Sequence, residues 1–333
     1  MKIIVPMAGR GSRLRPHTLT VPKPLIPIAG KPIVERLVED IVKVCEKKVE
    51  EIAFIIGDFG IETENKLIKI AEKLGAKGTI CHQTEPLGTA HAILCAEKSL
   101  IGNCVIAFAD TLFTADFTLD NTKDGIIWVN KIDDPSSFGV VKLNKDNIIT
   151  DFVEKPKNFV SDLAIIGVYY FNDGEYLKQE LKYLLENNIK DKGEYQLTNA
   201  LENMKNKGTM FSPGNVEEWL DCGNKDATIY TNERVLHRTG NFISEKSSII
   251  NSKIIPPCFI GDNVKINSST IGPYVSIEAD TSVNNSIIQN SIIQSHTDIL
   301  NTKLKNSMIG NHVLLVGTDV FQEISVGDYS QIK

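Results

Sequence analysis

The sequence predicts an α/β domain with a mixed, mostly parallel sheet over residues 1–238, followed by a parallel β-helix over residues 239–333. In the first part, short apolar runs alternate with segments of helical periodicity, as in sheets covered by helices on both faces. The run Val105 to Phe108 is apolar throughout, which is typical of a strand buried on both sides. In the last part helical periodicity disappears, and isoleucine and valine recur every six residues.

Each expected strand is a short apolar run that ends at a turn signal, and each expected helix repeats its apolar residues with a period near 3.6. The expected elements are strand 3–5, extended stretch 25–28, helix 33–45, strand 52–56, helix 61–74, strand 79–83, helix 89–99 and strand 104–108. Ligands of parallel sheets bind beyond the carboxyl ends of the strands. The loops after Val5 and Gln83, and the side chain of Asp110, are expected at that edge.

Composition narrows the class of protein. The chain has 36 basic and 42 acidic residues, a formal net charge of −6, and no basic stripe outside the first loop, which argues against a nucleic-acid partner. We expect a cytoplasmic protein with no membrane partner, because no signal peptide precedes the first strand and no apolar run approaches ~18 residues. The 6 cysteines are scattered singly, so free thiols are expected.

The loop after the first strand is rich in glycine and arginine. Gly9 and Gly11 allow the backbone to approach a bulky anion, and backbone N–H groups in such loops point into the space they enclose. Fixed positive charge near this space comes from Arg10, Arg13, Arg15 and Lys23, which predicts a phosphate-binding loop. A P-loop does not fit because Lys23 lies far beyond Gly11, and a dinucleotide fingerprint lacks its third glycine, where Leu14 stands.

The whole stretch resembles the signature of sugar-1-phosphate nucleotidyltransferases, G-x-G-[ST]-R-L-x-P-x-T followed by P-K-P. Its fixed positions are occupied here by Gly9, Gly11, Ser12, Arg13, Leu14, Pro16, Thr18, Pro22, Lys23 and Pro24. The resemblance implies a Rossmann-like domain in which Arg13 and Lys23 are catalytic. It further implies that Ala8, Gly9, Gly11 and Ser12 bind the nucleotide.

A second loop follows the strand that ends at Gln83. A side-chain amide offers both a donor and an acceptor to a pyrimidine base, and Gly88 allows the backbone to approach that base. The loop resembles the family pattern Q-x-x-P-x-G-x-A, which grips the nucleotide base. The resemblance assigns nucleotide binding to Gln83, Pro86, Gly88 and Thr89.

Two aspartates are candidate ligands of Mg²⁺, which prefers oxygen atoms and bridges substrate phosphates. Asp110 ends a buried strand, where family members commonly have Gly-Asp and this chain has Ala109 before it. Asp221 lies in Glu218–Gly223, which resembles the family's W-x-D-x-G. Either residue alone is compatible with a turn or a helix cap, and together they predict the metal pair.

The sugar site is predicted from three segments. Residues 138–141 and 152–156 are expected to form a hairpin with a polar turn at 144–147. By resemblance Gly139 and Glu154 line the sugar pocket, and Lys155 contacts the phosphate on the sugar. The segment Gly193–Thr198 matches the family's G-E-Y-x-L-T-D except for Asn199, so Glu194 is expected at the same pocket, at the start of a helix.

Residues 260–264, 271–275 and 309–313 have the form of hexapeptide β-helix turns. They resemble the left-handed β-helices appended to some nucleotidyltransferases, with an irregular β-sandwich as the alternative. About five coils of roughly 18 residues are expected. His296 and His312 lack a catalytic setting for an acyltransferase, so a structural or oligomerising role is expected. The paired isoleucines 287–288 and 292–293 exceed one inward row, which suggests a face toward a second copy of the chain. The alternative is that both members of each pair are buried between coils and the domain only caps the catalytic unit.

The predicted reaction is NTP plus sugar 1-phosphate giving NDP-sugar and pyrophosphate, with Mg²⁺ as cofactor. Gln83 and the W-L-D-C-G ending favour dTTP or UTP with glucose 1-phosphate. The alternatives are a mannose-1-phosphate guanylyltransferase and a non-catalytic, sugar-nucleotide-sensing paralogue.

Overall fold

The computed structural model describes residues 1–9, 11–115, 118–317 and 320–333. The chain forms two compact units. We call them the sheet unit, Met1–Gly9 with Glu35–Trp219, and the coil unit, Arg10–Val34 with Leu220–Lys333. The glycine- and arginine-rich loop therefore belongs to the same unit as the C-terminal region.

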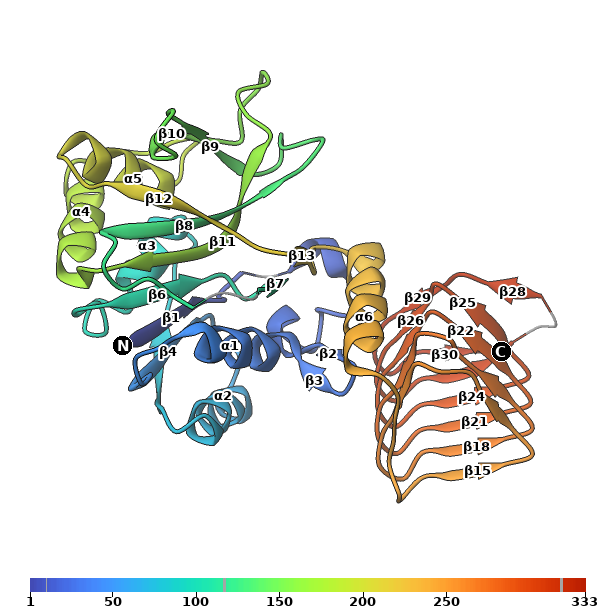
Figure 1. Cartoon of the computed structure of the whole chain (residues 1–333). Coiled ribbons are helices and arrows are strands. Elements are labelled where there is room, and N and C mark those ends of the chain that lie inside the picture. The colour runs from blue at the N-terminus through green and yellow to red at the C-terminus, as the bar shows by residue number, and fades with distance from the viewer. Residues whose placement is uncertain (10, 116–117, 318–319) are drawn as a thin grey trace. The chain divides into compact units, whose positions relative to one another are not determined.

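A central sheet organises the sheet unit, with strand order β10-β9-β11-β6-β1-β4-β5, and β8 and β12 pair beside β11 (Figure 1). Strands β6, β1, β4 and β5 are parallel, while β11 runs antiparallel to β6, so the predicted mixed sheet is confirmed. Its strands are β1 (Lys2–Pro6), β4 (Glu51–Ile56), β5 (Lys77–His82), β6 (Cys104–Ala107), β8 (Gly125–Lys131), β9 (Gly139–Leu143), β10 (Ile149–Glu154), β11 (Leu163–Phe171) and β12 (Phe211–Asn215). Two further strands are β7 (Thr111–Thr114) and β13 (Glu218–Asp221).

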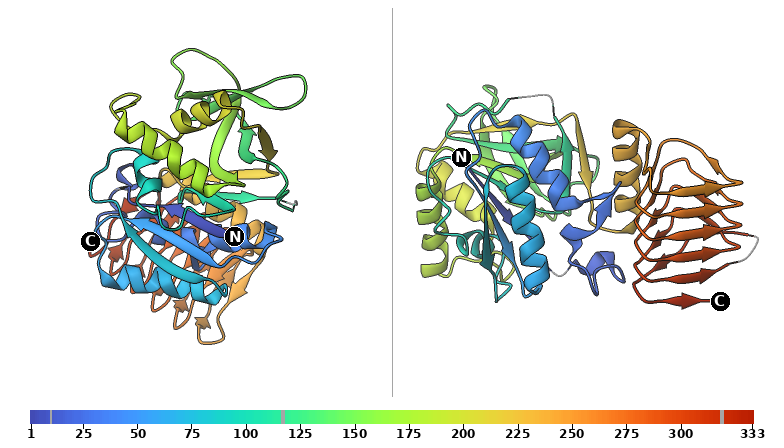
Figure 2. Two further views of the ribbon diagram at one scale, coloured as in Figure 1. Left: turned by 90° about the vertical axis from the view of Figure 1, so that its left-hand side faces the viewer. Right: turned by 90° about the horizontal axis from the view of Figure 1, so that it is seen from below.

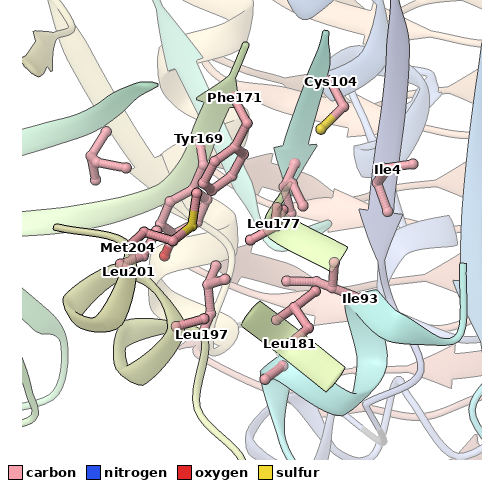
Figure 3. Close-up of a cluster of buried hydrophobic side chains, with 14 of the residues drawn as sticks. Ile4, Ile93, Cys104, Tyr169, Phe171, Leu177, Leu181, Leu197, Leu201 and Met204 are labelled. Carbon is pink, nitrogen blue, oxygen red and sulfur yellow. The ribbon is translucent and has the colours of Figure 1, made fainter. Parts of the chain in front are cut away.

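Helices cover the sheet because their apolar stripes need a partner surface. Figure 3 shows Leu177 and Leu181 of α4 and Leu197 of α5 packed near Tyr169 and Phe171 of β11. Burying each such side chain contributes about 1.5–3 kcal/mol. The helices are α1 (Ile33–Val44), α2 (Ile61–Lys73), α3 (Thr89–Leu94), α4 (Gly174–Glu186), α5 (Leu197–Asn206) and, in the coil unit, α6 (Lys225–Thr239). Among the described residues no helix is long and apolar enough to cross a membrane.

Two predicted elements differ from the structure. Helix α3 ends at Leu94 rather than Ser99, because the following amides bond three residues back, as Glu97 N does to Leu94 O, and tighten the chain into turns. The extended stretch predicted at 25–28 begins as a 3₁₀ turn, Lys23–Leu25, before the short strand β2 (Pro27–Ile28), which pairs with β3 (Lys31–Pro32). The hairpin of β9 and β10 is confirmed.

Three parallel sheets build the C-terminal part of the coil unit, and their stacked coils end at the C-terminus (Figure 2). They fit the predicted left-handed β-helix. The inward residues Ile266, Val283, Ile299 and Leu315 pair in register and are at most 1% exposed. These steps measure 16 or 17 residues rather than the expected 18. The strands are β14 (Phe242–Ile243), β15 (Ser248–Ile250), β16 (Lys253–Ile254), β17 (Cys258–Ile260), β18 (Lys265–Asn267), β19 (Thr270–Ile271), β20 (Val275–Ile277), β21 (Ser282–Asn284), β22 (Ile287–Gln289), β23 (Ile292–Ile293), β24 (Asp298–Leu300), β25 (Lys303–Lys305), β26 (Met308–Ile309), β27 (Leu314–Val316), β28 (Phe321–Gln322), β29 (Ser325–Val326) and β30 (Gln331–Ile332).

One sheet of the β-helix, β14-β17-β20-β23-β26-β29, has an outer face that other parts of the coil unit cover. We call this outer face the docking face; it is the register ladder Phe259, Ser276, Ile292, Met308 and Ser325. Ser276 Oγ donates to Asn232 Oδ1 of α6 at 2.6 Å, and Ile292 and Met308 are fully buried. Ile292, the outward member of the pair 292–293, is therefore buried within this chain, so that pair offers no exposed face to a second copy.

Candidate active site

The phosphate-binding loop predicted from the first motif is folded back on itself in the coil unit. Gly11 has φ +59, and a Cβ there would lie 2.9 Å from Lys23 Cβ and 3.1 Å from Thr18 Cγ2. Thr18 Oγ1 donates to Gly11 O at 2.8 Å. Glycine is needed at this position because the lysine stem and the threonine both pack against its backbone. Gly11 of G-x-G and Lys23 of P-K-P are thus brought together.

The two predicted catalytic cations differ in burial. Lys23 is only 7% exposed, and Pro22 and Pro24 lie on either side of it in the sequence. Arg13 lies in the 3₁₀ turn Ser12–Leu14, and the side chains of Arg13 and Ser12 are both exposed. A buried ammonium next to a glycine-lined backbone suits a fixed phosphate contact, whereas an exposed guanidinium is able to approach a charge that develops during reaction. Arg10 lies outside the described residues.

The base loop, residues 83–90 of the sheet unit, follows the carboxyl end of β5 as expected. A Cβ at Gly88 would lie 2.5 Å from Tyr195 O and 2.7 Å from Tyr195 N, and Gly88 has φ +117. Tyr195 N donates to Leu87 O, and Ala90 N donates to Tyr195 O, both at 2.9 Å. From the sequence, Gly88 is expected to allow close approach of the backbone to a base. In the structure glycine is needed there because the backbone of the Gly193–Thr198 segment occupies the space of a side chain.

Side chains of the base loop are already oriented. Gln83 Nε2 donates to Gly88 O at 3.3 Å and lies 3.1 Å from His91 Nδ1. Thr89 Oγ1 accepts from Leu197 N at 2.9 Å and donates to Gln196 Oε1 at 3.1 Å. Pro86 is exposed at the tip of the loop. With its amide nitrogen held, Gln83 presents Oε1, a hydrogen-bond acceptor, to a ligand.

The residues predicted for the sugar lie together in the sheet unit. Glu154 Oε2 is 3.4 Å from Thr198 Oγ1, and a Cβ at Gly139 would lie 3.1 Å from the same carboxylate oxygen. Burial, with the nearby Glu154 charge, raises the pKa of the Tyr169 hydroxyl above its ordinary value, so Tyr169 remains neutral. Glu154, Thr198 and Gly139 form a small polar corner beside this ring.

Lys155 has a strained backbone. Its φ of +42 is uncommon for a residue with a side chain, and such strain clusters at functional sites. Lys155 N donates to Phe138 O at 3.1 Å, and Lys192 Nζ donates to Lys155 O at 3.0 Å. The Lys155 ammonium is 3.7 Å from Glu154 Oε1. The strained turn is thus held on both sides and aims its ammonium beside the polar corner.

Sequence reasoning missed two supporting residues here. Gln196 is 7% exposed and donates through Nε2 to Glu194 Oε2 at 3.0 Å, while its Oε1 accepts from Thr89. Lys192 fixes the turn at Lys155. Gln196 stands at the variable position of G-E-Y-x-L-T, and Lys192 precedes that motif, so neither carries a motif signal.

The two predicted metal ligands belong to different units: Asp110 follows β6 at the carboxyl edge of the sheet, and Asp221 ends β13. A Cβ at Gly223 would lie 2.6 Å from Asp221 Oδ2, so the motif glycine makes room for this carboxylate. Carboxylate oxygens at both positions fit a Mg²⁺ ion. No cluster of at least 3 His, Cys, Asp or Glu side chains suited to a metal is found in the described ranges.

The predicted site residues therefore fall into two groups. Gln83, Pro86, Gly88 and Thr89 are connected through Gln196 and Tyr195 to the sugar segment with Glu194, while Gly139, Glu154 and Lys155 lie at the end of the β9–β10 hairpin. Ala8 and Gly9 follow β1 in the same unit. The coil unit holds Gly11, Ser12, Arg13, Lys23 and Asp221.

Known proteins are similar to this chain in sequence and in fold. A family model described as nucleotidyl transferase matches residues 2–238. A glucose-1-phosphate thymidylyltransferase of Streptomyces antibioticus is 28% identical over 324 residues, which cover 90% of this chain and 88% of the relative. A bifunctional protein GlmU of Methanococcus maripaludis is 31% identical over 268 residues, covering 75% of this chain and 62% of the relative.

Among solved structures, a UDP-glucose pyrophosphorylase complexed with UDP-glucose matches with a TM-score of 0.58 and 23% identity, covering 71% of this chain and 98% of that one. That likeness shows the fold alone. The family model spans more than half of the chain and includes both glycine loops and both aspartates. The resemblance stated from the motifs is confirmed: this chain is a member of the nucleotidyl transferase family.

Proposed function

We propose that this chain transfers a nucleotidyl group from an NTP to a sugar 1-phosphate, releasing pyrophosphate. The preferred substrates are glucose 1-phosphate with dTTP or UTP. The proposal is supported by the family membership and by the relative from Streptomyces antibioticus, whose length this chain spans almost entirely.

One observation carries the proposal: the base loop and the sugar segment are hydrogen-bonded to each other. Thr89 and Ala90 of the base loop bond to Leu197 N, Gln196 Oε1 and Tyr195 O. The residues proposed to contact the nucleotide and those proposed to contact the sugar are therefore neighbours within a single unit, which supports an enzyme that joins the two.

In the proposed reaction a phosphate oxygen of the sugar 1-phosphate attacks the α-phosphorus of the NTP. The new P–O bond forms as the bond between the α-phosphorus and the bridging oxygen breaks, and pyrophosphate leaves with that electron pair. The nucleophile is already anionic near neutral pH, so positioning and charge neutralisation supply the catalysis. Lys155 holds the attacking phosphate, Lys23 the α-phosphate and Arg13 the charge on the leaving pyrophosphate.

A bound Mg²⁺ would be held by Asp110 and Asp221 and would offset charge on the NTP phosphates. Because Gln83 presents an acceptor, a base with a ring N–H, such as uracil or thymine, suits the base loop. Guanine also has a ring N–H, so GTP with mannose 1-phosphate is the rival pair.

Pyrophosphate release from dTTP, UTP, GTP, CTP and ATP, each with glucose, mannose and N-acetylglucosamine 1-phosphates, tests the proposal. We expect the highest kcat/KM with dTTP or UTP and glucose 1-phosphate. Release with none of the pairs, while the chain still binds an NDP-sugar, would instead favour the sensing paralogue.

We also keep as proposals a catalytic region over residues 1–238, a β-helix domain over 239–333, a cytoplasmic location and a homo-oligomer. The family model ends at residue 238, next to the end of α6, which supports the boundary. Sedimentation of the full chain tests the last proposal, which a monomer would contradict.

A further inference from the structure

The segment from Pro16 to Gly30, which follows the phosphate-binding loop in sequence, is bonded to the far end of the chain. Its partners lie on α6 and on the β-helix, 203 to 308 residues later. All of these contacts are within the coil unit. The segment therefore rests on the docking face rather than forming an independent surface loop.

His17 is the most buried polar contact of this segment. Its side chain is 1% exposed, and Nε2 shares a hydrogen bond of 3.0 Å with Ser325 Oγ at the edge of the docking face. Beside it the last coil has Gly327, where a Cβ would lie 2.9 Å from Pro16 Cβ. The β-helix is thus shaped to receive Pro16 and His17.

A second contact lies three residues further along. Thr20 Oγ1 donates to Asp328 Oδ2 at 2.6 Å. The other oxygen, Oδ1, accepts from Asn311 N of the neighbouring coil at 2.8 Å. Because a backbone amide already fixes Asp328, the carboxylate is oriented for Thr20.

The end of the segment is fixed in the same way. Ala29 N donates to Asn232 Oδ1 of α6 at 3.1 Å, and Gly30 N donates to Glu278 Oε1 of the β-helix at 3.1 Å. A Cβ at Gly30 would overlap the Phe259 ring of the docking face. Both ends of the segment that contains Lys23 are therefore attached.

These contacts are linked to the predicted catalytic residues through the backbone. His17 N donates to Leu14 O at 3.1 Å, and Leu14 ends the 3₁₀ turn that carries Arg13. The next residue, Thr18, bonds Gly11 O. Fixing the His17 ring thus restrains the turn that presents Arg13.

We propose that the last coils of the β-helix position the phosphate-binding loop, and that His17 and Thr20 are positioning residues which act through Arg13 and Lys23. The β-helix is then a structural part of the NTP site. The identity of the loop's ligand rests on the function proposed above, whereas the attachment of the loop does not.

Hydrogen–deuterium exchange of the full-length chain tests the attachment directly. The variants are Ser325→Ala combined with Thr20→Val, and His17→Leu. Each removes hydrogen bonds to the β-helix, and we expect amides of residues 12–26 to exchange about fivefold faster for each hydrogen bond removed. His17→Gln, whose amide reaches the position of Nε2, should restore slow exchange.

Ser248→Ala is the matched control, because this exposed serine lies in the first coil of the β-helix. Its loop amides should exchange as in the unmodified chain. Ser325→Ala with Thr20→Val changes exposed side chains only, so the fold should survive even if His17→Leu does not fold. Unchanged exchange of residues 12–26 in that double variant would overturn the proposal.

Steady-state kinetics add a readout that general loss of stability would not reproduce. In the double variant the KM for NTP should rise about fivefold, while the KM for sugar 1-phosphate stays unchanged, because Glu154 and Lys155 belong to the sheet unit. Equal changes in both KM values would contradict a role in positioning this loop. If the loop amides respond but no substrate pair releases pyrophosphate, the proposed function fails and the attachment stands.

Discussion

The base loop and the phosphate-binding loop both contain a glycine with positive φ, but the segments that hold the two loops in place lie at different distances along the chain. Gly88 makes room for the backbone of Tyr195 in the sheet unit, and its loop bonds to the start of α5. Gly11 makes room for Lys23, only twelve residues later, while the segment beyond it depends on Ser325 and Asp328. The base loop is thus stabilised by the start of α5, 107 to 108 residues along the chain, whereas the segment after the phosphate-binding loop is stabilised by the C-terminal coils, 308 residues along the chain.

Arg13 and Gln83 should separate the two loops kinetically. Arg13→Ala should lower kcat by roughly 10²–10³-fold, since its charge matters most as pyrophosphate leaves. Gln83→Met should mainly raise the KM for NTP, because a base contact is the same in ground and transition states. A change in KM alone for Arg13→Ala would make both residues uniform binding contacts.

The two aspartates test whether both units serve one metal. Asp110→Asn and Asp221→Asn should each lower turnover by about a hundredfold, or about 2.7 kcal/mol, with the fold retained. In a titration with Mg²⁺, both variants should need a higher Mg²⁺ concentration to reach half of their maximal turnover. Near-normal turnover of either variant would remove that residue from the metal site.

Gly88→Ala and Gly9→Ala compare a glycine that makes room for the protein's own backbone with one that we expect to make room for a ligand. A Cβ at Gly88 meets the Tyr195 backbone, so Gly88→Ala should destabilise the fold by about 2–3 kcal/mol in denaturant titration. Among the described residues other than Gly9 and its chain neighbours, no heavy atom lies within 4 Å of a Cβ built at Gly9. Gly9→Ala should therefore retain stability and weaken NTP binding, whereas a drop in stability would show that Gly9 is structural.

His17 should make the attachment of the phosphate-binding loop sensitive to acid. Burial lowers the pKa of His17 to about 4 from 6.5, with Asp328 opposing this shift and Lys225 adding to it. In the unfolded chain His17 binds a proton below about pH 6.5, whereas in the folded chain it binds one only below about pH 4. The stability of the fold is therefore fully present above about pH 6.5 and falls as the pH drops from there toward 4.

Between pH 7.5 and 5 the loss attributable to His17 should be about 2 kcal/mol. Thermal melts of the unmodified chain and of His17→Gln at both pH values measure it. The variant should lose less stability on acidification, and equal losses would show that His17 titrates normally in the folded chain.

Lys192 should have the smallest effect, confined to the sugar side. Lys192→Met removes the donor to Lys155 O and should raise the KM for sugar 1-phosphate about fivefold, with the KM for NTP unchanged. Lys157→Met is the control, because it removes the same charge from an exposed position two residues after Lys155. Equal effects of the two variants would reduce the role of Lys192 to its charge.

The sequence by itself determined the order of elements up to residue 108, the mixed, mostly parallel sheet, the β-helix and the family. These follow from short-range signals: apolar periodicity, glycine loops before helices, and inward residues such as Ile266 and Val283 that repeat with each coil. The motifs also gave the candidate residues that the structure places at strand ends. The sequence did not determine where α3 ends. A 3₁₀ turn, in which amides bond three residues back, and an α-helix, in which they bond four residues back, have nearly the same sequence pattern.

Only the tertiary structure decided which distant segments support these motifs. His17, Gln196 and Lys192 occupy positions that no motif fixes, and their importance comes from partners far along the chain, as with Ser325 for His17. Likewise, Ile292 points outward from its coil but is buried, because other parts of the coil unit cover the docking face. Local periodicity records which side of an element is apolar, but the partner of that side depends on long-range packing, which no local pattern encodes.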